Sequence, residues 1–527
     1  MTIGACFDQV CDSHPDTLAL ISCQQGRRLT YAQLRTRVDA LACGFRRLGL
    51  VKGDRVGIWA PNCEEWVLTQ YATAKLGLIL VNVNPAYRTS EVEYALNLVG
   101  CRAIVLAPMF KTSNYVEMVQ DLMPERLPDL EFVIQIGTEA APGFIAFEDL
   151  ITSPKTGELN ELQRISAELS PDDPINIQFT SGTTGAPKGA TLTHLNILNN
   201  GYFVCEAIEL KAGEALCIPI PLYHCFGMVM GVLGCLTHQA TVVLPSDAFE
   251  PGAVLKALDD EACVGVYSVP TMFIAMLDHD RLASANLSAL RTGIMAGSPC
   301  PTEVMKRVIN DLGCKGVTIA YGMTETSPVS LQSALDDPIE KRVSTVGRIQ
   351  PHVEVKLIDD KGQIVPRGET GEICTRGYLV MQGYWSDEAR TSEAIDAEGF
   401  MHTGDLGVMD KAGYVAITGR SKDMVIRGGE NISPREVEEF LYRHPGIRDV
   451  QVVGVPDPKF GEELCACVIA KSDTLGEDDV RDFCKGEIAH YKVPRYVAFF
   501  DEFPLTVTGK VQKFILRDQV RKMFDLD

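Results

Sequence analysis

The sequence predicts an α/β protein: a large N-terminal domain of layered α/β subdomains with a small β unit, then a small α+β C-terminal domain. Short apolar runs that look like buried strands alternate with segments of helical periodicity over the first 345 residues. Such alternation is typical of mixed or mainly parallel sheets with helices on their faces. The texture changes near residue 345 and again near residue 420, which predicts two boundaries.

The first helix is predicted over residues 30–48. Thr30 and Gln33 have capping-box spacing, and the apolar residues that follow recur on one helical face. Buried strands are expected at 55–60, 78–83, 102–107, 175–179, 240–245, 264–270, 292–296 and 317–321.

Shorter strands bounded by glycines follow, at 353–359, 371–375 and 413–418. They predict a small β unit at about residues 345–420, inside an N-terminal domain of residues 1–420. Residues 421–527 are predicted to form the C-terminal domain, with helices at 434–442 and 478–489 and strands at 450–455 and 465–471.

Composition narrows the classes of function. The chain has 527 residues, a formal net charge of −21 and a pI near 4.9, which argues against nucleic acid and anionic membranes as partners. Its 17 cysteines include no CxxC pair, and Cys465 and Cys467 fall on one face of a strand, so buried thiols in a reducing compartment are expected. No segment approaches the ~20 apolar residues of a membrane span. No targeting signal is evident at either end, so the expected location is the cytoplasm.

The segment 180–189 has the composition of a phosphate-binding loop. Its glycines let backbone N–H groups converge on an anion, its hydroxyls add donors, and a lysine adds positive charge. It lacks Walker A spacing, because Pro187 precedes Lys188 and Gly189 follows it. A flexible surface turn is the alternative. The residues predicted to bind polyphosphate are Thr180, Ser181, Gly182, Thr183, Thr184, Gly185 and Lys188.

Three further positions have chemistry that suits a nucleotide. Glu325 follows a predicted strand and can hold Mg²⁺, although a capped helix start explains the same residues. Asp405 can accept two hydrogen bonds, as paired ribose hydroxyls require, or simply close an Asx turn. Arg420 can reach ribose or phosphate oxygens, and taken alone is an ordinary surface arginine.

Five segments, in this order and spacing, resemble the core motifs of the adenylate-forming superfamily: 180–189, 321–327, 402–405, 419–434 and 504–510. The resemblance covers essentially the whole chain. It implies ATP, Mg²⁺ and coenzyme A as cofactors, and a carboxylic acid as the substrate. It also implies two half-reactions, in which an acyl-adenylate forms with release of pyrophosphate and a thiol then displaces AMP.

The resemblance also implies roles for individual residues. Lys510 stands at the position of the family's catalytic lysine, and Thr324 at that of a ligand of the α-phosphate. Lys422 stands at the hinge about which the mobile C-terminal domain rotates, bringing Gly428 and Gly429 to the pantetheine arm. The adenine and ribose pocket is expected to contain Gly297, Ser298, Pro299, Tyr321, Gly322, Asp405 and Arg420.

The segment 219–234 resembles the family's acid-binding element. It is apolar, and its glycines at 227, 231 and 234 are expected to leave room for an aliphatic tail. His224 stands where relatives that activate amino acids carry an aspartate, so an α-ammonium group would lack its partner. His224 is expected to orient the carboxylate or gate the pocket, and a structural histidine is the alternative. Further lining residues are expected to be Val269, Met272 and Met323.

We therefore expect an acyl-CoA synthetase for medium-chain or branched aliphatic acids. An aryl-acid CoA ligase of the coumarate type is the nearest alternative. An oxygenating side activity, as in luciferases, stays open, whereas an amino-acid adenylation domain is disfavoured. A non-catalytic nucleotide or acyl-CoA sensor is the alternative from another class, but it would be expected to lack Glu325 or Lys510. A homodimer is compatible with the sequence, which does not define the oligomeric state.

Overall fold

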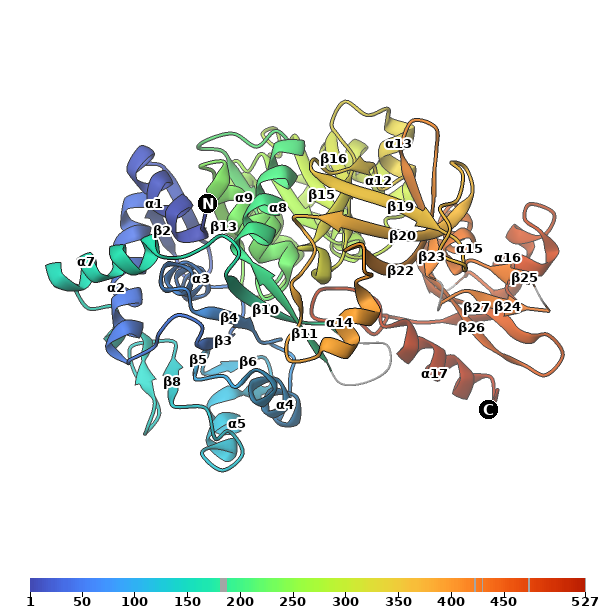
Figure 1. Cartoon of the computed structure of the whole chain (residues 1–527). Helices are drawn as coiled ribbons and strands as arrows, with labels where there is room; N and C mark the ends of the chain where they lie inside the picture. The colour runs from blue at the N-terminus through green and yellow to red at the C-terminus, as the bar shows by residue number, and fades with distance from the viewer. Residues whose placement is uncertain (181–186, 421–422, 429, 473, 527) are drawn as a thin grey trace.

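The computed structural model describes residues 1–180, 187–420, 423–428, 430–472 and 474–526. It has a large N-terminal domain and a smaller C-terminal domain, which lie at opposite ends of the molecule in Figure 1. Two large sheets and a small sheet belong to the first domain, and a further sheet forms the second. The predicted α/β fold class is confirmed.

Nine strands form the first large sheet. Its central strands are parallel, whereas β2 at one edge and β17 and β18 at the other pair antiparallel. In spatial order the strands are β18 (Arg348–Ile349), β17 (Val329–Gln332), β16 (Gly316–Gly322), β15 (Thr292–Met295), β14 (Gly265–Ser268), β12 (Ala215–Cys217), β13 (Thr241–Leu244), β1 (Leu18–Ser22) and β2 (Arg27–Thr30).

The second large sheet has eight strands, again with a parallel centre. β11 and β21 extend it antiparallel at one edge. In spatial order its strands are β21 (Gly383–Tyr384), β11 (Lys188–Thr193), β10 (Pro174–Thr180), β4 (Ile79–Asn82), β3 (Arg55–Trp59), β5 (Ala103–Leu106), β8 (Phe132–Gln135) and β9 (Ile145–Ala146). A separate short hairpin consists of β6 (Met109–Phe110) and β7 (Ser113–Asn114).

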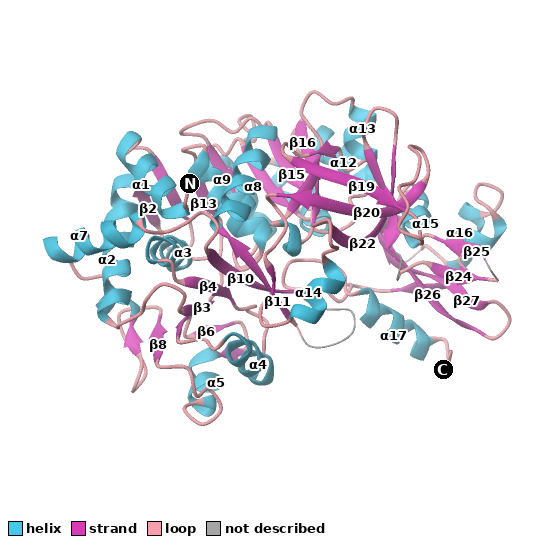
Figure 2. Cartoon of the chain, viewed as in Figure 1, coloured by secondary structure: helices cyan, strands magenta, loops and turns pink. Residues whose placement is uncertain are grey.

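Helices cover these sheets, as the cyan ribbons of Figure 2 show. The predicted first helix is α2 (Tyr31–Arg47), and Thr30 caps it in the expected capping box with Gln33. The other helices up to residue 310 are α1 (Ile3–Ser13), α3 (Glu64–Leu76), α4 (Thr89–Val99), α5 (Tyr115–Leu122), α6 (Phe147–Leu150), α7 (Thr156–Ala167), α8 (His194–Ala207), the π-helix η1 (Phe226–Leu233), α9 (Gly234–Thr237), α10 (Pro251–Asp260), α11 (Pro270–Leu277), the 3₁₀ helix η2 (Asp280–Ala283) and α12 (Thr302–Asn310).

The small sheet consists of four antiparallel strands, β19 (Val353–Ile358), β20 (Thr370–Gly377), β22 (Met401–Met409) and β23 (Val415–Arg420). It corresponds to the β unit predicted near residues 345–420. The helices around it are η3 (Thr324–Thr326), α13 (Ile339–Ser344) and α14 (Glu388–Ala394).

The C-terminal domain is built on β24 (Val425–Arg427), β25 (Glu430–Ile432), β26 (Ile447–Asp457), β27 (Gly461–Ala470) and β28 (Tyr496–Phe499). Cys465 and Cys467 are buried in β27, as predicted. The helices are α15 (Pro434–Leu441), α16 (Glu477–Cys484), η4 (His490–Lys492) and α17 (Lys513–Met523).

One predicted helix was too long. The segment expected to be helical to residue 489 ends at Cys484, because Lys485 is extended and Gly486 has a φ of +81° in the left-handed region. Within the described ranges, no helix combines the length and apolar character that crossing a bilayer requires.

Candidate active site

The predicted phosphate-binding loop connects two antiparallel strands of the second sheet. Thr180 ends β10 and lies opposite Lys188, which begins β11. The loop therefore follows a strand, as predicted, and its two ends are fixed by the hairpin. The predicted residues between these ends, Ser181, Gly182, Thr183, Thr184 and Gly185, lie outside the described residues.

Tyr384 connects Glu325 with Lys188, and it belongs to none of the sequence motifs. It lies in β21, where it pairs with Ala190 of β11. Its hydroxyl donates a hydrogen bond of 2.9 Å to Oε1 of the buried Glu325, and its ring centroid lies 4.7 Å from the Lys188 ammonium. Burial and the nearby Glu325 raise the pKa of Tyr384 above its ordinary value, so the hydroxyl stays a proton donor.

A second group of side chains surrounds Asp405, which is 7% exposed. Strands β22 and β23 place Asp405 opposite Arg420, whose Nε donates to Oδ1 at 2.8 Å. The Tyr321 hydroxyl donates to Oδ2 at 2.7 Å. The structure thus brings these three predicted nucleotide-binding residues together, although they come from three different strands.

Lys510 enters the site from the C-terminal domain. It ends a tight turn in which the backbone N–H of Thr506 donates to its carbonyl at 2.8 Å. Desolvation and then the positive charge of Arg420 lower the pKa of Lys510, against the opposing effect of Asp405, although the side chain as a whole is exposed. Its ammonium therefore lies within electrostatic reach of the Asp405–Arg420 pair.

The turn that carries Lys510 is docked directly on the N-terminal domain. The hydroxyl of Thr271, in α11, donates to the Gly509 carbonyl at 2.9 Å. A Cβ on Gly509 would lie only 2.9 Å from Cγ2 of Val269, so this close approach favours glycine. Val269, predicted to line the acid pocket, therefore also forms part of the surface on which the C-terminal domain docks.

His224 lies between Lys510 and the segment after β16. Burial and the charge of Lys510 lower its pKa to about 4, so the imidazole is neutral near pH 7. Its Nδ1 accepts a hydrogen bond of 3.2 Å from the backbone N–H of Phe226, which assigns the proton to Nε2. The Cys225 thiol lies 3.7 Å from the same nitrogen and 4.0 Å from Oγ1 of Thr324.

The segment around Gly322 is held by backbone packing. A Cβ on Gly322 would lie 1.7 Å from the carbonyl oxygen of Pro328, so this position requires glycine. Thr324 begins η3 directly after it, next to Glu325. The predicted second wall of the adenine pocket, Gly297, Ser298 and Pro299, follows the neighbouring strand β15 in the same sheet. A Cβ on Gly297, whose φ is +86°, would lie 3.1 Å from Val269 Cγ1.

The expectation that glycines leave room for an acyl tail was wrong. A Cβ on Gly227 would lie 2.6 Å from the Pro221 carbonyl, and one on Gly231 would lie 2.6 Å from Ile218. For Gly234 the corresponding distance is 2.4 Å, to the Cys205 sulfur. These glycines therefore allow the π-helix η1 and the start of α9 to pack tightly against their neighbours.

The other two predicted lining residues are Met272, which is 4% exposed in α11, and Met323, which is partly buried against the hydrophobic core of the N-terminal domain. The predicted hinge residue Lys422 and the predicted pantetheine-loop residue Gly429 lie outside the described residues. Gly428 is described, and its N–H donates to the Phe460 carbonyl at 2.8 Å within the C-terminal domain.

The fold and this arrangement define a two-domain nucleotide-dependent enzyme in which the second domain supplies a lysine to the site. The model of the AMP-binding enzyme family matches residues 7–385, and that of the AMP-binding enzyme C-terminal domain matches residues 436–510. The chain belongs to the AMP-binding enzyme family, and the resemblance inferred from its motifs is confirmed.

Relatives and solved structures extend over the whole chain. YngI of Bacillus subtilis, named as a candidate acyl-CoA synthetase, is 46% identical, covering 100% of this chain and 98% of the relative. The medium-chain acyl-CoA ligase ACSF2 of Danio rerio, named as mitochondrial, is 45% identical, over 100% of this chain and 89% of the relative. Among solved structures, the anthranilate CoA ligase AuaEII with anthranoyl-AMP has a TM-score of 0.88 and is 25% identical. The match covers 100% of this chain and 98% of that structure. ATP-bound MatB from Rhodopseudomonas palustris has a TM-score of 0.84 at 28% identity over 99% and 100%.

Proposed function

We propose that this enzyme is an AMP-forming acyl-CoA synthetase that activates medium-chain or branched aliphatic acids. The supporting observation is a set of side chains gathered around one site. Contacts join Lys188, Tyr384 and Glu325, and others join Cys225 to His224 and Thr324. Lys510 lies close enough to His224 and to the Asp405–Arg420 pair for their charges to interact. The relatives named as acyl-CoA synthetases and medium-chain ligases agree with this activity.

In the first half-reaction, a carboxylate oxygen of the acid attacks the α-phosphorus of ATP. The bond between the α-phosphorus and the bridging oxygen breaks, and pyrophosphate leaves. Two anions must meet in this step, so fixed positive charge lowers its barrier. Lys510 would bridge the carboxylate and the α-phosphate, Lys188 would hold the outer phosphates, and Thr324 would donate to the α-phosphate.

Glu325 is the residue that would hold Mg²⁺. It is buried beside Tyr384, whose ring contacts Lys188. Among the residues that the structure describes, Tyr384 donates to Oε1 of the carboxylate, and no donor lies on Oε2. A carboxylate so placed fits a hard cation that also binds phosphate oxygens. When bound, Mg²⁺ neutralises charge on the triphosphate.

The nucleoside would bind at the ends of β15 and β16, next to Gly297 and Tyr321. Asp405 would accept hydrogen bonds from the paired ribose hydroxyls, with Arg420 beside it. The Tyr321 ring and the 297–299 turn would form the two walls around adenine, while Gly322 allows the backbone to turn closely there.

His224 would act as a neutral hydrogen-bond donor toward the acid. Its Nδ1 is occupied by the Phe226 N–H, so the protonated Nε2 is the nitrogen left to orient the carboxylate. The apolar side chains of Val269, Met272 and Met323 would line the tail. This lining contains no carboxylate for an α-ammonium group, which favours a plain carboxylic acid.

The second half-reaction would follow a rotation of the C-terminal domain, residues 421–527, at Lys422. The CoA thiolate attacks the carbonyl carbon of the acyl-adenylate, and the bond to the AMP oxygen breaks. Gly428 and Gly429 would then approach the pantetheine arm. The present arrangement, with Lys510 near His224 and Arg420, would suit the first half-reaction.

ATP–pyrophosphate exchange with a panel of acids tests this proposal. Exchange should be greatest with acids of six to ten carbons, and thioester should form only when CoA is added. Lys510→Ala should lose about 10²-fold or more of exchange, while Lys522→Ala, which removes an exposed lysine of the same domain, should not. Lack of exchange with any acid, although ATP binds, would refute the enzyme and favour a sensor.

An aryl acid is the second candidate substrate, because the anthranilate CoA ligase AuaEII has a similar fold over the whole chain. Highest exchange with benzoate or coumarate would keep the mechanism and overturn the aliphatic preference. The predicted cytoplasmic location and the homodimer stay predictions; cell fractionation and the mass in solution test them.

A further inference from the structure

The segment that carries Asp405 is a large bulge in β22. Glu372 of β20 pairs with Leu406, and Cys374 pairs with His402. Two positions on β20 therefore span four on β22, and residues 403–405 stand opposite a single residue. A bulge of this kind re-aims side chains, and bulges are enriched beside active sites. Here it directs Asp405 toward Tyr321 and Arg420.

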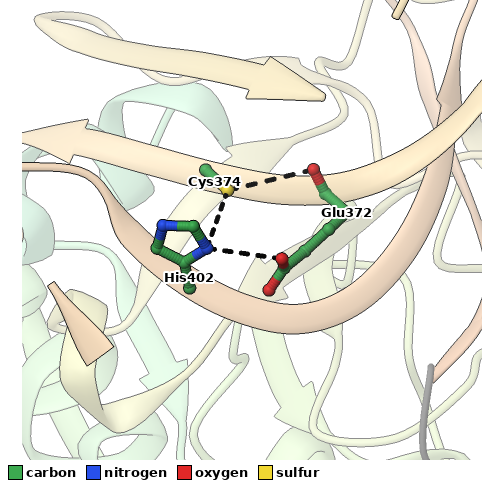
Figure 3. A group of neighbouring side chains, drawn as sticks. All are labelled: Glu372, Cys374 and His402. Carbon is green, nitrogen blue, oxygen red and sulfur yellow. Dashed lines mark hydrogen bonds and ion pairs between the residues drawn. The ribbon is translucent and has the colours of Figure 1, made fainter. Parts of the chain in front are cut away.

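Glu372 replaces the ladder hydrogen bonds that the bulge removes. Its Oε1 accepts the backbone N–H of Gly404 at 3.0 Å, and its Oε2 lies 3.3 Å from Nδ1 of His402. Figure 3 shows the Glu372 carboxylate facing the His402 ring. Gly404 has a φ of +70°, which glycine adopts readily. Because glycine is also free to leave this conformation, its hydrogen bond to Glu372 helps to hold it.

Thr403 completes the support. Its hydroxyl donates to the Ile373 carbonyl at 2.7 Å and accepts the backbone N–H of Asp405 at 3.1 Å. Thr403 and Gly404 are therefore tied to β20, through Ile373 and Glu372, and Asp405 is tied to Thr403. The ribose-facing carboxylate stands on the last of these residues.

Cys374 lies 3.6 Å from Nδ1 of His402, and together with Glu372 these are residue types that bind divalent metals. The contacts favour a different role. Glu372 is engaged by Gly404 and His402, and Nε2 of His402 lies 3.6 Å from Asp396. Burial, followed by the charge of Glu372, raises the pKa of Cys374 to about 12, which disfavours the thiolate that a metal requires.

We propose that Glu372 is a positioning residue for ribose recognition, acting through the 402–405 bulge on the orientation of Asp405. This inference rests on the proposed role of Asp405 toward the ribose hydroxyls. Removal of the Glu372 carboxylate removes its 3.0 Å bond to the Gly404 N–H and its contact with His402, which should loosen the bulge. The enzyme should then lose its preference for a nucleotide that carries these hydroxyls.

The test compares KM for ATP and for 2′,3′-dideoxy-ATP in pyrophosphate exchange, in the full-length enzyme. Glu372→Ala should reduce the preference for ATP roughly tenfold, as expected for one lost hydrogen bond to a charged group. Glu372→Gln should retain most of it, because the amide has the same shape as the carboxylate and its oxygen still accepts from the Gly404 N–H. Glu354→Ala is the matched control: it removes an exposed glutamate paired with Arg376 in the same sheet.

Three results separate the possibilities. If the wild-type enzyme shows no preference for ATP, the role of Asp405 in the proposed function fails. If the wild-type enzyme prefers ATP and Glu372→Ala keeps this preference, positioning by Glu372 is refuted. The same holds if the variant raises KM for both nucleotides by the same factor. If Glu372→Ala does not fold, Thr403→Val replaces it, because this isosteric change removes the two other bonds of the bulge and should also weaken the preference.

Discussion

The hydroxyl of Tyr384 offers the most specific test of how the phosphate end of the site is organised. Tyr384→Phe removes the donor of the 2.9 Å hydrogen bond to Glu325 and keeps the ring beside Lys188. The change therefore separates the orientation of the carboxylate from the placement of the lysine. If Glu325 must be held in one rotamer to bind Mg²⁺, the first half-reaction should suffer.

The expected size follows from the burial of the pair. Hydrogen bonds to charged groups contribute about 1.5–3 kcal/mol, and each 1.36 kcal/mol corresponds to a factor of ten in rate. Glu325 is 5% exposed, so water does not readily replace the missing hydroxyl. We expect pyrophosphate exchange to fall about 10- to 100-fold, with a higher Mg²⁺ concentration needed for half-maximal exchange.

The assay measures exchange over a range of Mg²⁺ concentrations, and thioester formation from synthetic acyl-AMP and CoA in parallel. The second reaction contains no triphosphate, so Tyr384→Phe should leave it nearly unchanged. Tyr31→Phe is the matched control, because its buried hydroxyl donates to the Ala240 carbonyl at 2.8 Å, outside the site.

Exchange within twofold of wild type at every Mg²⁺ concentration would refute the reasoning, since the hydroxyl would then have no part in holding Glu325. An equal loss in both half-reactions would also refute it. Such a result would mean that the substitution disturbs the fold rather than the phosphate end of the site.

Three other predictions concern backbone packing and protonation. Gly322→Ala should lower the free energy of unfolding by about 3 kcal/mol or more, because its Cβ would lie 1.7 Å from a backbone carbonyl oxygen. Gly157→Ala, in an open part of α7, is the control and should be neutral or slightly stabilising. Thermal melts of both variants measure the difference. His224, with its pKa lowered to about 4 chiefly by burial, should contribute no ionisation to exchange between pH 5.5 and 8, and a limb present in wild type but absent from His224→Asn would contradict this. Burial raises the pKa of Asp449 to about 6, so its contribution to stability is fully present below about pH 4 and should fall by up to about 3 kcal/mol as the pH rises through 6. Urea unfolding of Asp449→Asn should lack this slope, and parallel curves would exclude the effect.

Local patterns predicted much of this molecule. Capping at Thr30, apolar runs of strand length and glycine-bounded strands depend on neighbouring residues, so the sequence alone displays them. The motifs also predicted that Tyr321, Asp405 and Arg420 lie together. Hydrogen bonds join these three residues, although they lie on three separate strands.

Contacts between distant segments were not predictable in the same way. Tyr384 meets Glu325 across 59 positions, and the Thr271–Gly509 hydrogen bond spans 238. Neither pair has a local signature, because a tyrosine in a short edge strand and a threonine at the start of a helix are ordinary residues. The wrong expectation for Gly227 has a similar cause. A glycine in a sequence is compatible both with open space and with close packing of a neighbour, and only the structure distinguishes them.

The charges around Lys510 bear on the domain rotation that we propose between the two half-reactions. Lys510 is brought close enough to Arg420 for the repulsion between them to lower its pKa, and it lowers the pKa of His224 in turn. A bound triphosphate would offset this repulsion, because its negative charge lies among the cations. Departure of pyrophosphate removes most of that negative charge and restores the repulsion around Lys510. The turn of Lys510 is held on the N-terminal domain by the Thr271–Gly509 hydrogen bond and close contact with Val269, so the restored repulsion would act against these contacts. The first reaction would thereby promote the rotation that the second one needs.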